Sequence, residues 1–461
     1  MKRKQVLLCI FAVVTALSMN IGAGTASAEA ERAWDLTLPS LKDTFADYFG
    51  VGNILEPVES ANAETAAMFK HHYNFVTAEN AMKPSNLSRG PGDFRLFQSD
   101  QLVDWAVENG INVVGHTLVW HSQSARWLNT NDDGSPLTRA EARENMEEYI
   151  NTVAGHFAGR IYSWDVVNEA FQTSVSSAPA ETIDGWWRTM LRTGSGGNDA
   201  SMWYAAYANG MDEEAGEHPG DYIYDAFVFA RLADPNAILY YNDFNETDQG
   251  KREAMAQMTE ELNKQWETDP LNTEPGRLLI EGLGMQAHYW TDNLTPASVE
   301  LTIMRFAETG ARVSITELDI PIGRWNGYRE ANEETLARQA ELYQQLFEVF
   351  MRHSDSIERV TFWGKADTQS WRRQGNPLLF DGSFRAKPAF HSIMAVAPDP
   401  SLPSEPDPEE DDDENITDVA EDGGDDGRDE QDFSWGIIAI AIAGGGVLVL
   451  GGTLLMLNKR K

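Results

Sequence analysis

The sequence predicts an α/β protein whose folded part is one (β/α)8 barrel, the architecture also called a TIM barrel. Three observations predict this fold. Eight apolar runs of strand length recur along the chain, helical stretches separate them, and polar side chains cluster where the runs end. The runs are continuously apolar rather than alternating, which is typical of parallel strands buried on both faces.

The eight runs lie between Trp34 and Pro398, and each has the length of a β-strand. They span residues 48–55, 74–78, 112–119, 161–167, 237–242, 280–287, 312–318 and 357–363. No sequence repeat accompanies this periodicity. We therefore expect a single barrel domain over residues 34–398.

Two of the stretches between the runs carry clear helix signals. The first opens with Thr138 and has Glu141 three residues later, which is the pattern of a capping box. Apolar residues then follow at intervals of three and four, as far as Phe157. A second helix is predicted from Leu336 to Phe350 by the same spacing.

The first 28 residues have the pattern of a secretory signal peptide. Basic residues at 2–4 precede a largely apolar run through Leu17, and residues 26–28 are the small residues of a cleavage site. We expect cleavage after Ala28. The only cysteine, Cys9, lies in this segment, so the mature chain has none for a disulfide, a metal site or a catalytic thiol.

Residues 400–434 form an acidic linker, with 16 acidic residues against one basic residue. Such a segment repels itself and is expected to be disordered. Residues 436–457 carry no charge and, at about 1.5 Å per residue, can cross a bilayer core of about 30 Å. A basic tail at 458–461 follows. This order predicts a C-terminal transmembrane helix, a cytoplasmic tail and a barrel outside the cell, anchored in the cell membrane.

Two alternatives to the membrane anchor are weaker. A buried core helix could also be uncharged, but such a helix rarely follows a highly acidic linker. A cell-wall sorting signal also ends in an apolar run and a basic tail, but no Leu-Pro-x-Thr-Gly motif precedes residues 436–457.

The formal net charge is −36, from 36 basic and 72 acidic residues. This balance excludes a nucleic-acid binder that works through a generally basic surface. The linker carries −15 and the two basic ends carry +6, which leaves −27 for residues 29–399. The folded domain is therefore acidic itself, and we interpret its charge as a solvated surface suited to a salty or alkaline habitat.

Polar residues stand at the ends of most of the predicted strands, where the chemistry of a (β/α)8 barrel belongs. The strings are TAENAMK at 77–83, GHTLVWHSQ at 115–123, WDVVNE at 164–169, QAH at 286–288 and TELD at 316–319, with Trp363 and Trp371 at the last strand. Together they place carboxylates, imidazoles, amides and indoles around one mouth of the barrel.

The strings TAENAMK, GHTLVWHSQ, WDVVNEA, YYNDFN, MQAH, ITELD and TFWG with SW, in this order, resemble those of glycoside hydrolase family 10, the endo-1,4-β-xylanases. The resemblance covers about residues 36–398. It implies hydrolysis of internal β-1,4 bonds of xylan with retention of configuration. It also implies xylan and xylo-oligosaccharides as ligands, no metal or other cofactor, and no protein partner.

Cleavage of a glycosidic bond needs one protonated and one ionised carboxyl group. By resemblance, Glu169 is the acid/base and Glu317 is the nucleophile. Asn168 is expected to contact the 2-hydroxyl of the sugar, which requires the strand to break there, because neighbours in a strand face opposite sides. His288 and Asp319 resemble the pair that orients the nucleophile and keeps it ionised.

Binding of a sugar chain needs aromatic platforms and polar side chains. Trp120, Trp363 and Trp371 are the expected platforms beside the cleaved bond on the glycone side. Hydrogen bonds are expected there from Glu79, Asn80, Lys83, His116, Gln123 and Gln286. Phe244 stands where relatives commonly have tyrosine, so stacking under the leaving-group sugar is possible but the phenol hydrogen bond is not.

Three questions stay open at this point. A catalytically idle xylan-binding surface protein is one alternative, although both glutamates stand in intact strings. An enzyme of the same fold acting on β-1,4-glucan is another, because xylose differs from glucose only by the missing hydroxymethyl group. Finally, the long segment 173–220 either walls the groove or packs on the barrel, and we expect packing.

Overall fold

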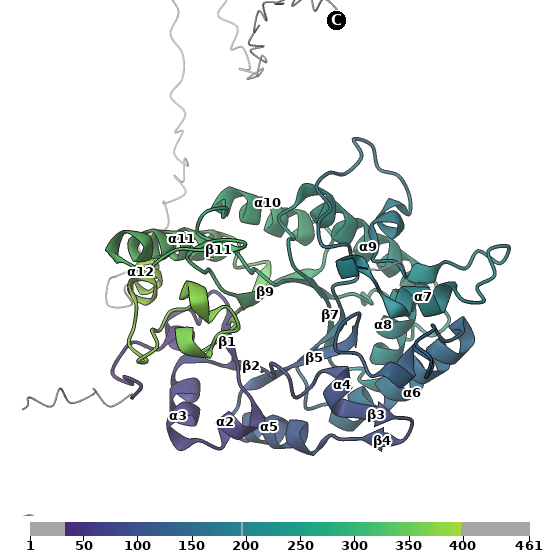
Figure 1. The fold of residues 1–461 in the computed structure, drawn as a ribbon, viewed down its shortest axis with the longest axis horizontal. Coiled ribbons are helices and arrows are strands. Elements are labelled where there is room, and N and C mark those ends of the chain that lie inside the picture. The colour runs from purple at the N-terminus through teal and green to yellow at the C-terminus, as the bar shows by residue number, and fades with distance from the viewer. Residues whose placement is uncertain (1–32, 195–196, 398–461) are drawn as a thin grey trace, which may run out of the picture. The chain divides into compact units, whose positions relative to one another are not determined.

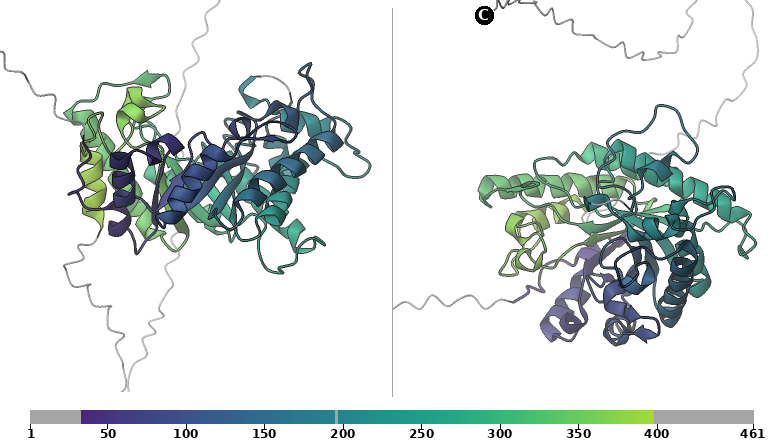
Figure 2. Two further views of the ribbon diagram at one scale, coloured as in Figure 1. Left: turned by 90° about the horizontal axis from the view of Figure 1, so that it is seen from below. Right: turned by 45° about the vertical axis from the view of Figure 1, so that its right-hand side comes forward.

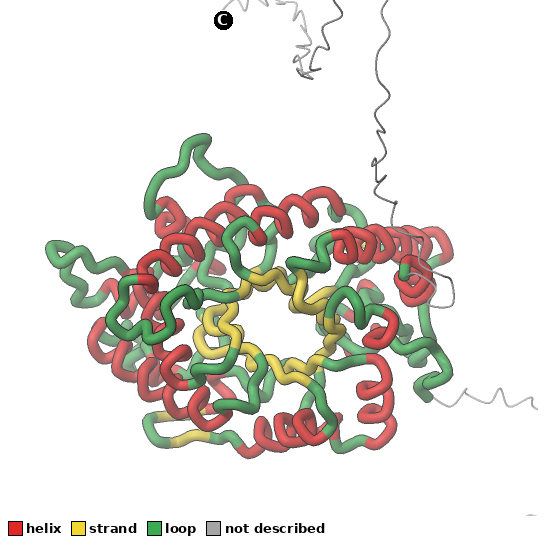
Figure 3. Tube along the Cα trace, turned by 180° about the vertical axis from the view of Figure 1, so that it is seen from behind, coloured by secondary structure: helices red, strands yellow, loops and turns green. Residues whose placement is uncertain are grey.

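In the computed structural model, which describes residues 33–194 and 197–397, eight parallel strands close into a barrel (Figures 1 and 3). Each strand pairs with its neighbours in chain order, and the last strand, β12, pairs with the first, β1. The strands are β1 (Gly50–Ile54), β2 (Phe75–Thr77), β5 (Asn112–Trp120), β6 (Ser163–Asn168), β7 (Ile238–Asp243), β8 (Gly282–Met285), β9 (Arg312–Leu318) and β12 (Ile357–Phe362).

All eight predicted strands are confirmed, and no strand end moves by more than two residues. The predicted runs are mostly longer than the strands. Apolar residues indicate which part of the chain is buried, whereas a strand extends only as far as its backbone hydrogen bonds. Ile161 and Ile280, for example, are buried but precede the strands that their runs predict.

Helices surround the strand ring on its outside (Figure 2). The capping box is confirmed: Thr138 Oγ1 accepts a hydrogen bond from the Glu141 amide, while Glu141 Oε2 accepts one from the Thr138 amide at 2.9 Å. The helices are α1 (Leu41–Thr44), α2 (Pro57–Ser60), α3 (Ala63–His72), α4 (Pro84–Leu87), α5 (Phe97–Glu108), α6 (Arg139–Phe157), α7 (Met202–Ala208), α8 (Tyr222–Ala233), α9 (Gln249–Glu267), α10 (Pro296–Ala307), α11 (Glu333–Arg352) and α12 (Pro388–Val396).

Two short hairpins were not predicted. One consists of β3 (Ser88–Gly90) and β4 (Asp93–Phe94), and the other of β10 (Gly323–Arg324) and β11 (Gly327–Tyr328). Strands of two or three residues are too short to produce a periodic sequence pattern. The second hairpin follows β9 and therefore lies at the carboxyl end of the barrel.

At the amino-terminal end of the barrel, a partly buried polar group surrounds Glu358, the second residue of β12. Tyr162 and Tyr240 donate their phenol hydroxyls to the two oxygens of Glu358, at 2.8 and 2.5 Å. Arg312 also donates to this carboxylate, at 2.5 Å. These contacts link β6, β7, β9 and β12 at the end of the barrel opposite to the side chains that the sequence singles out.

The predicted signal peptide at 1–28, acidic linker at 400–434, transmembrane helix at 436–457 and tail at 458–461 lie outside the described residues. Within the described ranges, no helix combines the length and the apolar character needed to cross a membrane.

Candidate active site

At the carboxyl end of the barrel, one buried amide links the strand ends that carry the two glutamates. Glu169 directly follows β6, and Glu317 is the next-to-last residue of β9. Asn242 in β7 donates its Nδ2 to Glu317 Oε1 at 2.9 Å and to Asn168 Oδ1 at 3.0 Å. Thr316 Oγ1 donates to Asn242 Oδ1 at 2.7 Å and so fixes the orientation of the amide.

Glu317 is buried, and both of its oxygens accept hydrogen bonds. Asn242 donates to Oε1, and His288 Nε2 donates to Oε2 at 3.1 Å. Burial by itself raises the pKa of Glu317. The His288 hydrogen bond and the charges of His116 and His288 outweigh burial, so the pKa lies below its ordinary value. This carboxyl group is therefore ionised at neutral pH.

His288 lies between two carboxylates. Its Nε2 faces Glu317, and its Nδ1 lies 3.2 Å from Asp319 Oδ1. Burial alone lowers the pKa of His288, but Asp319 and Glu317 overcome this effect and raise the pKa to about 9. The ring is therefore an imidazolium at neutral pH and donates a charge-assisted hydrogen bond to Glu317.

Asp319 is fully buried and is held from its other side by two donors that follow β12. Trp371 Nε1 donates to Oδ2 at 2.9 Å, and Arg372 donates to Oδ1 at 2.5 Å. Burial raises the pKa of Asp319, but the charges of His288 and Arg372 more than offset it and keep the pKa below its ordinary value. A chain of alternating charge thus runs from Arg372 through Asp319 and His288 to Glu317.

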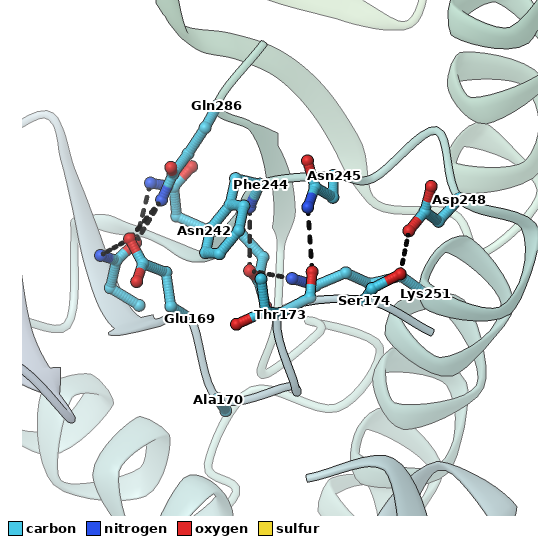
Figure 4. Close-up of polar contacts among 12 residues, drawn as sticks. Glu169, Ala170, Thr173, Ser174, Asn242, Phe244, Asn245, Asp248, Lys251 and Gln286 are labelled. Carbon is cyan, nitrogen blue, oxygen red and sulfur yellow. Dashed lines mark hydrogen bonds and ion pairs between the residues drawn. The ribbon is translucent and has the colours of Figure 1, made fainter. Parts of the chain in front are cut away.

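Glu169 has a φ of 55°, a left-handed conformation that residues other than glycine seldom adopt. β6 ends at Asn168. The strand therefore breaks at the expected place, which allows Asn168 and Glu169 to face the same site. Asn168 Nδ2 lies 3.3 Å from Glu169 Oε1, and Gln286 Nε2 donates to the same oxygen at 3.0 Å (Figure 4).

The backbone on both sides of Glu169 is held by hydrogen bonds. Its amide donates to the Asn242 carbonyl at 2.9 Å, and its carbonyl accepts from Nε of the buried Arg192 at 2.8 Å. The next amide, of Ala170, donates to the hydroxyl of the buried Tyr241 at 3.0 Å. A left-handed non-glycine residue costs about 1–3 kcal/mol, and these contacts stabilise it.

Indole rings lie around the two histidines of the site. The ring of Trp363, directly after β12, is centred 5.5 Å from His116 and 6.4 Å from His288. The ring of Trp371 is centred 5.0 Å from His288 and is 53% exposed. Trp120, the last residue of β5, lies 6.5 Å from His116. The structure thus brings all three predicted platform residues to one end of the barrel.

The turn after β2 brings three predicted polar residues together. Lys83 donates to Asn80 Oδ1 at 3.2 Å, and its ammonium group lies 5.3 Å above the Trp120 ring. Burial lowers the pKa of Lys83 and raises the pKa of its neighbour Glu79. The Asn80 amide donates to Glu56 Oε1 at 2.5 Å, which fixes the turn.

His116 and Gln123 differ in how the structure places them. His116 is buried, and its Nδ1 pairs with Asp165 Oδ2 at 2.9 Å. Gln123 is exposed, and its backbone carbonyl accepts a hydrogen bond from the Ser85 amide at 2.9 Å. Among the described residues, the Gln123 side chain has no hydrogen-bond partner, so its place in the site rests on the resemblance alone.

Phe244 directly follows β7, the strand that pairs with β6 where Glu169 stands (Figure 4). The ammonium group of the buried Lys251 is 4.1 Å from the centre of its ring and 2.7 Å from Oδ1 of the buried Asp243. This cation–π contact and the ion pair stabilise the position of the ring. Phe244 offers an aromatic surface without a polar atom.

The tryptophans of the long segment 173–220 pack on the barrel, as expected. Trp187 and Trp203 are buried, and Trp186 is half-buried against the same core. The start of the segment is pinned beside Phe244, since the Thr173 carbonyl accepts from Asn245 Nδ2 at 2.9 Å and Ser174 Oγ donates to Asp248 Oδ2 at 3.0 Å (Figure 4).

Three functional residues were missed in the sequence. Asn242 could have been found, because it lies in the string YYNDFN at a strand end. Arg372 and Arg192 gave no signal, since nothing in the spacing of the chain connects either of them to His288 or to Glu169.

Comparison with known proteins agrees with this geometry. The model of the family described as glycosyl hydrolase family 10 matches residues 40–396. A protein named endo-1,4-beta-xylanase A, from Thermotoga neapolitana, is 38% identical over 380 residues, which are 80% of this chain but 32% of that protein. The chain thus spans about a third of that relative's length. A beta-1,4-xylanase of Dictyoglomus thermophilum is 34% identical over 79% of this chain and 93% of its own.

Solved structures resemble the barrel as well. A family 10 xylanase with a bacterial Ig-like domain from termite gut has a TM-score of 0.67 at 34% identity, over 78% of each chain. A xylanase of Paenibacillus barcinonensis, solved with a conduramine derivative, has a TM-score of 0.65 at 30% identity, over 77% of this chain and 98% of that one. From the family match, these relatives and the two glutamates at the carboxyl end of a closed barrel, we conclude that the chain belongs to glycosyl hydrolase family 10.

Proposed function

We propose that the barrel is an endo-1,4-β-xylanase that hydrolyses internal β-1,4-xylosidic bonds with retention, with Glu169 as acid/base and Glu317 as nucleophile. One observation carries the assignment of roles: the two carboxyl groups have unequal surroundings. Glu317 is buried against an imidazolium and an amide. Glu169 is more exposed, and within the described part of the chain it accepts hydrogen bonds from the neutral amides of Gln286 and Asn168, with His121 Nδ1 3.9 Å from its Oε2.

The reaction then has two steps. Glu317, kept ionised by His288, attacks the anomeric carbon while the acid form of Glu169 protonates the departing oxygen. The proton leaves Glu169 with the leaving-group sugar, and a covalent xylosyl-enzyme remains. Glu169 next takes a proton from water, which attacks the same carbon and releases Glu317. Asn168 is proposed to bind the 2-hydroxyl, whose hydrogen bond strengthens in the transition state.

The aromatic residues are proposed to hold the sugar chain. Trp120, Trp363 and Trp371 offer ring surfaces on the glycone side, and Phe244 offers one under the leaving-group sugar. The polar residues proposed to bind the hydroxyl groups there are Glu79, Asn80, Lys83, His116, Gln123 and Gln286. The xylanase names of the relatives support xylan as the substrate class.

The experiment that tests this function measures reducing-sugar release by the purified full-length protein from xylan and from soluble cellulose, side by side. The proposal expects cleavage of xylan with much weaker cleavage of cellulose, and no cleavage of either by Glu317→Gln. Equal rates on both polymers would favour the β-1,4-glucan alternative. Binding to xylan without any cleavage would favour an idle binding protein.

We also propose that the protein is secreted through residues 1–28 and anchored in the cell membrane through residues 436–457, with residues 400–434 as the spacer. The sequence patterns of these segments support the proposal. Full-length protein should sediment with membranes, resist carbonate extraction and become soluble, with its activity intact, after cleavage within 400–434. Recovery of uncleaved protein from the culture medium would contradict the anchor.

A further inference from the structure

The peptide group that follows Glu169 is held at both of its polar atoms. Its oxygen, the Glu169 carbonyl, accepts a hydrogen bond from Arg192 Nε at 2.8 Å, and its amide, that of Ala170, donates to the Tyr241 hydroxyl at 3.0 Å. Arg192 lies in the long segment after β6 and Tyr241 lies in β7, and both side chains are buried. Two buried side chains from different parts of the chain thus fix the plane of one peptide group.

The Tyr241 hydroxyl is itself anchored by a buried ion pair. It donates to Asp243 Oδ2 at 2.5 Å, and Asp243 Oδ1 lies 2.7 Å from the Lys251 ammonium group. All three side chains are fully buried. Burial raises the pKa of Tyr241 well above its ordinary value, so the hydroxyl stays protonated. Because its single proton goes to Asp243, its lone pairs are left to accept the Ala170 amide, and its orientation is fixed.

This peptide group controls the direction of the Glu169 side chain. Glu169 has a φ of 55°, and a residue with a side chain relaxes from this left-handed conformation toward negative φ unless its surroundings prevent it. The Glu169 amide is fixed on β7, since it donates to the Asn242 carbonyl at 2.9 Å. A change in φ would therefore rotate the side chain and the following peptide group together. Arg192 and Tyr241 hold that peptide group, so they oppose this rotation.

We propose that Tyr241 and Arg192 are positioning residues for acid catalysis, which hold the Glu169–Ala170 peptide group and thereby keep the Glu169 carboxyl group within reach of the departing glycosidic oxygen. Both act through the backbone of Glu169 rather than on the substrate. The inference rests on the proposed function, in which Glu169 protonates that oxygen. A displacement of about 1 Å at a reacting group can lower the rate about 100-fold, so the loss of either contact should be measurable.

A positioning role predicts a loss that depends on the leaving group. A sugar hydroxyl is a poor leaving group and needs a proton from Glu169, whereas dinitrophenolate departs without one. Both kinds of substrate need the same attack by Glu317. A misplaced Glu169 should therefore lower kcat/KM for a xylo-oligosaccharide and hardly affect kcat/KM for a dinitrophenyl xylobioside. A general disturbance of the barrel would lower both.

The test compares Tyr241→Phe with Tyr240→Phe in the full-length protein. Tyr240 is the preceding residue of β7, is also fully buried and also donates its hydroxyl to a carboxylate, that of Glu358, at 2.5 Å. Its contacts lie at the opposite end of the barrel, so it is a matched control. Tyr241→Phe should lower kcat/KM for xylohexaose about tenfold to 100-fold, and kcat/KM for dinitrophenyl xylobioside less than about threefold. Tyr240→Phe should leave the ratio of the two values unchanged.

A second variant reaches the same peptide group from its other end. Arg192→Lys keeps the buried positive charge but removes the Nε that holds the Glu169 carbonyl. It should show the same selective loss on xylohexaose as Tyr241→Phe. Thermal unfolding shows whether each variant is folded, and if Tyr241→Phe does not fold, Arg192→Lys decides alone.

A ratio of the two kcat/KM values that is unchanged in the folded variants would overturn the inference. Equal losses on xylohexaose and on dinitrophenyl xylobioside would overturn it too, because they would show a structural effect that is not specific to acid catalysis. The wild type is measured on both substrates in the same experiment. Its failure to cleave xylohexaose would instead contradict the proposed function.

Discussion

His288 determines the charge state of the carboxylates in the site. It is buried between Glu317 and Asp319, and their charges raise its pKa to about 9. The unfolded chain has a histidine of ordinary pKa, about 6.5. Protonation of His288 therefore stabilises the folded state fully below about pH 6.5, and this contribution disappears as the pH rises through about 9.

The first prediction follows from this difference in pKa. His288→Asn removes the titrating ring, so the variant should be less stable than the wild type at pH 6, and the gap in Tm should narrow between pH 6.5 and 9.5. Thermal unfolding of both proteins across this range measures the gap. A gap that stays constant over the range would show that His288 is not protonated between its two carboxylates.

The residues that support Glu169 show what a sequence can and cannot predict at this scale. Glu169, Asn168 and Gln286 were predicted to line one site because each stands at a strand end, and the structure brings them into hydrogen-bonding contact. Arg192 was not predicted, although its Nε holds the Glu169 carbonyl. It lies in an irregular segment whose path only the folded barrel determines.

Among the secondary-structure elements, β5 and β6 show how glycines permit close packing between neighbouring strands of the barrel. A Cβ at Gly115 would lie 2.1 Å from the ring of Trp164, so the indole occupies the space that any other residue would fill. Gly282 stands against Tyr240 in the same way, at 2.3 Å. Large rings on one strand thus pack against glycines on the next strand in the ring.

The second prediction concerns the start of α6, where Thr138 and Glu141 cap each other. Thr138→Ala removes the acceptor for the Glu141 amide and should lower the free energy of unfolding by about 1 kcal/mol, measured by urea denaturation. Thr138→Ser keeps the hydroxyl and is the matched control. If the alanine and serine variants were equally stable, the capping hydrogen bond would contribute nothing.

Elements were predicted well where burial imposes a long pattern and poorly where it does not. All eight barrel strands and the helix from Thr138 follow from apolar runs and spacing. The hairpin β10–β11 does not, because its two strands of two residues each are specified by Gly323 and by contacts with the loop after β8.

For the molecule as a whole, the dominant feature is its negative charge. Residues 29–399 carry a net charge of −27. Like charges on one surface repel each other in dilute buffer, and salt screens this repulsion within about 10 Å at 0.1 M ionic strength. Salt should therefore stabilise a protein with such an acidic surface more than a protein with a neutral surface.

The third prediction is that a chain shortened to residues 29–399 folds by itself and has a higher Tm in 2 M NaCl than in 20 mM NaCl. Sodium sulfate is a poor comparison because it also strengthens burial of apolar surface, so choline chloride serves as the second salt. A Tm that is flat or falls with both salts would remove the argument for a salty or alkaline habitat and leave the enzymatic reading intact.

Azide rescue tests most directly whether Glu169 is the acid/base and Glu317 the nucleophile. Glu169→Ala should still form the xylosyl-enzyme from a xylobioside with an activated nitrophenol leaving group, because that leaving group needs no acid catalysis. Hydrolysis of this xylosyl-enzyme then stalls, because no base activates water. Azide needs no base, so it should react with the xylosyl-enzyme and restore turnover.

The measurement is the anomeric configuration of the azide product, read by NMR. Azide attacks the covalent intermediate on the face that water would use, so Glu169→Ala should give the β-azide, in which configuration is retained. Glu317→Ala forms no such intermediate and can give at most the α-azide. A β-azide from Glu317→Ala with an α-azide from Glu169→Ala would exchange the two roles, and identical behaviour of both variants would contradict the assignment altogether.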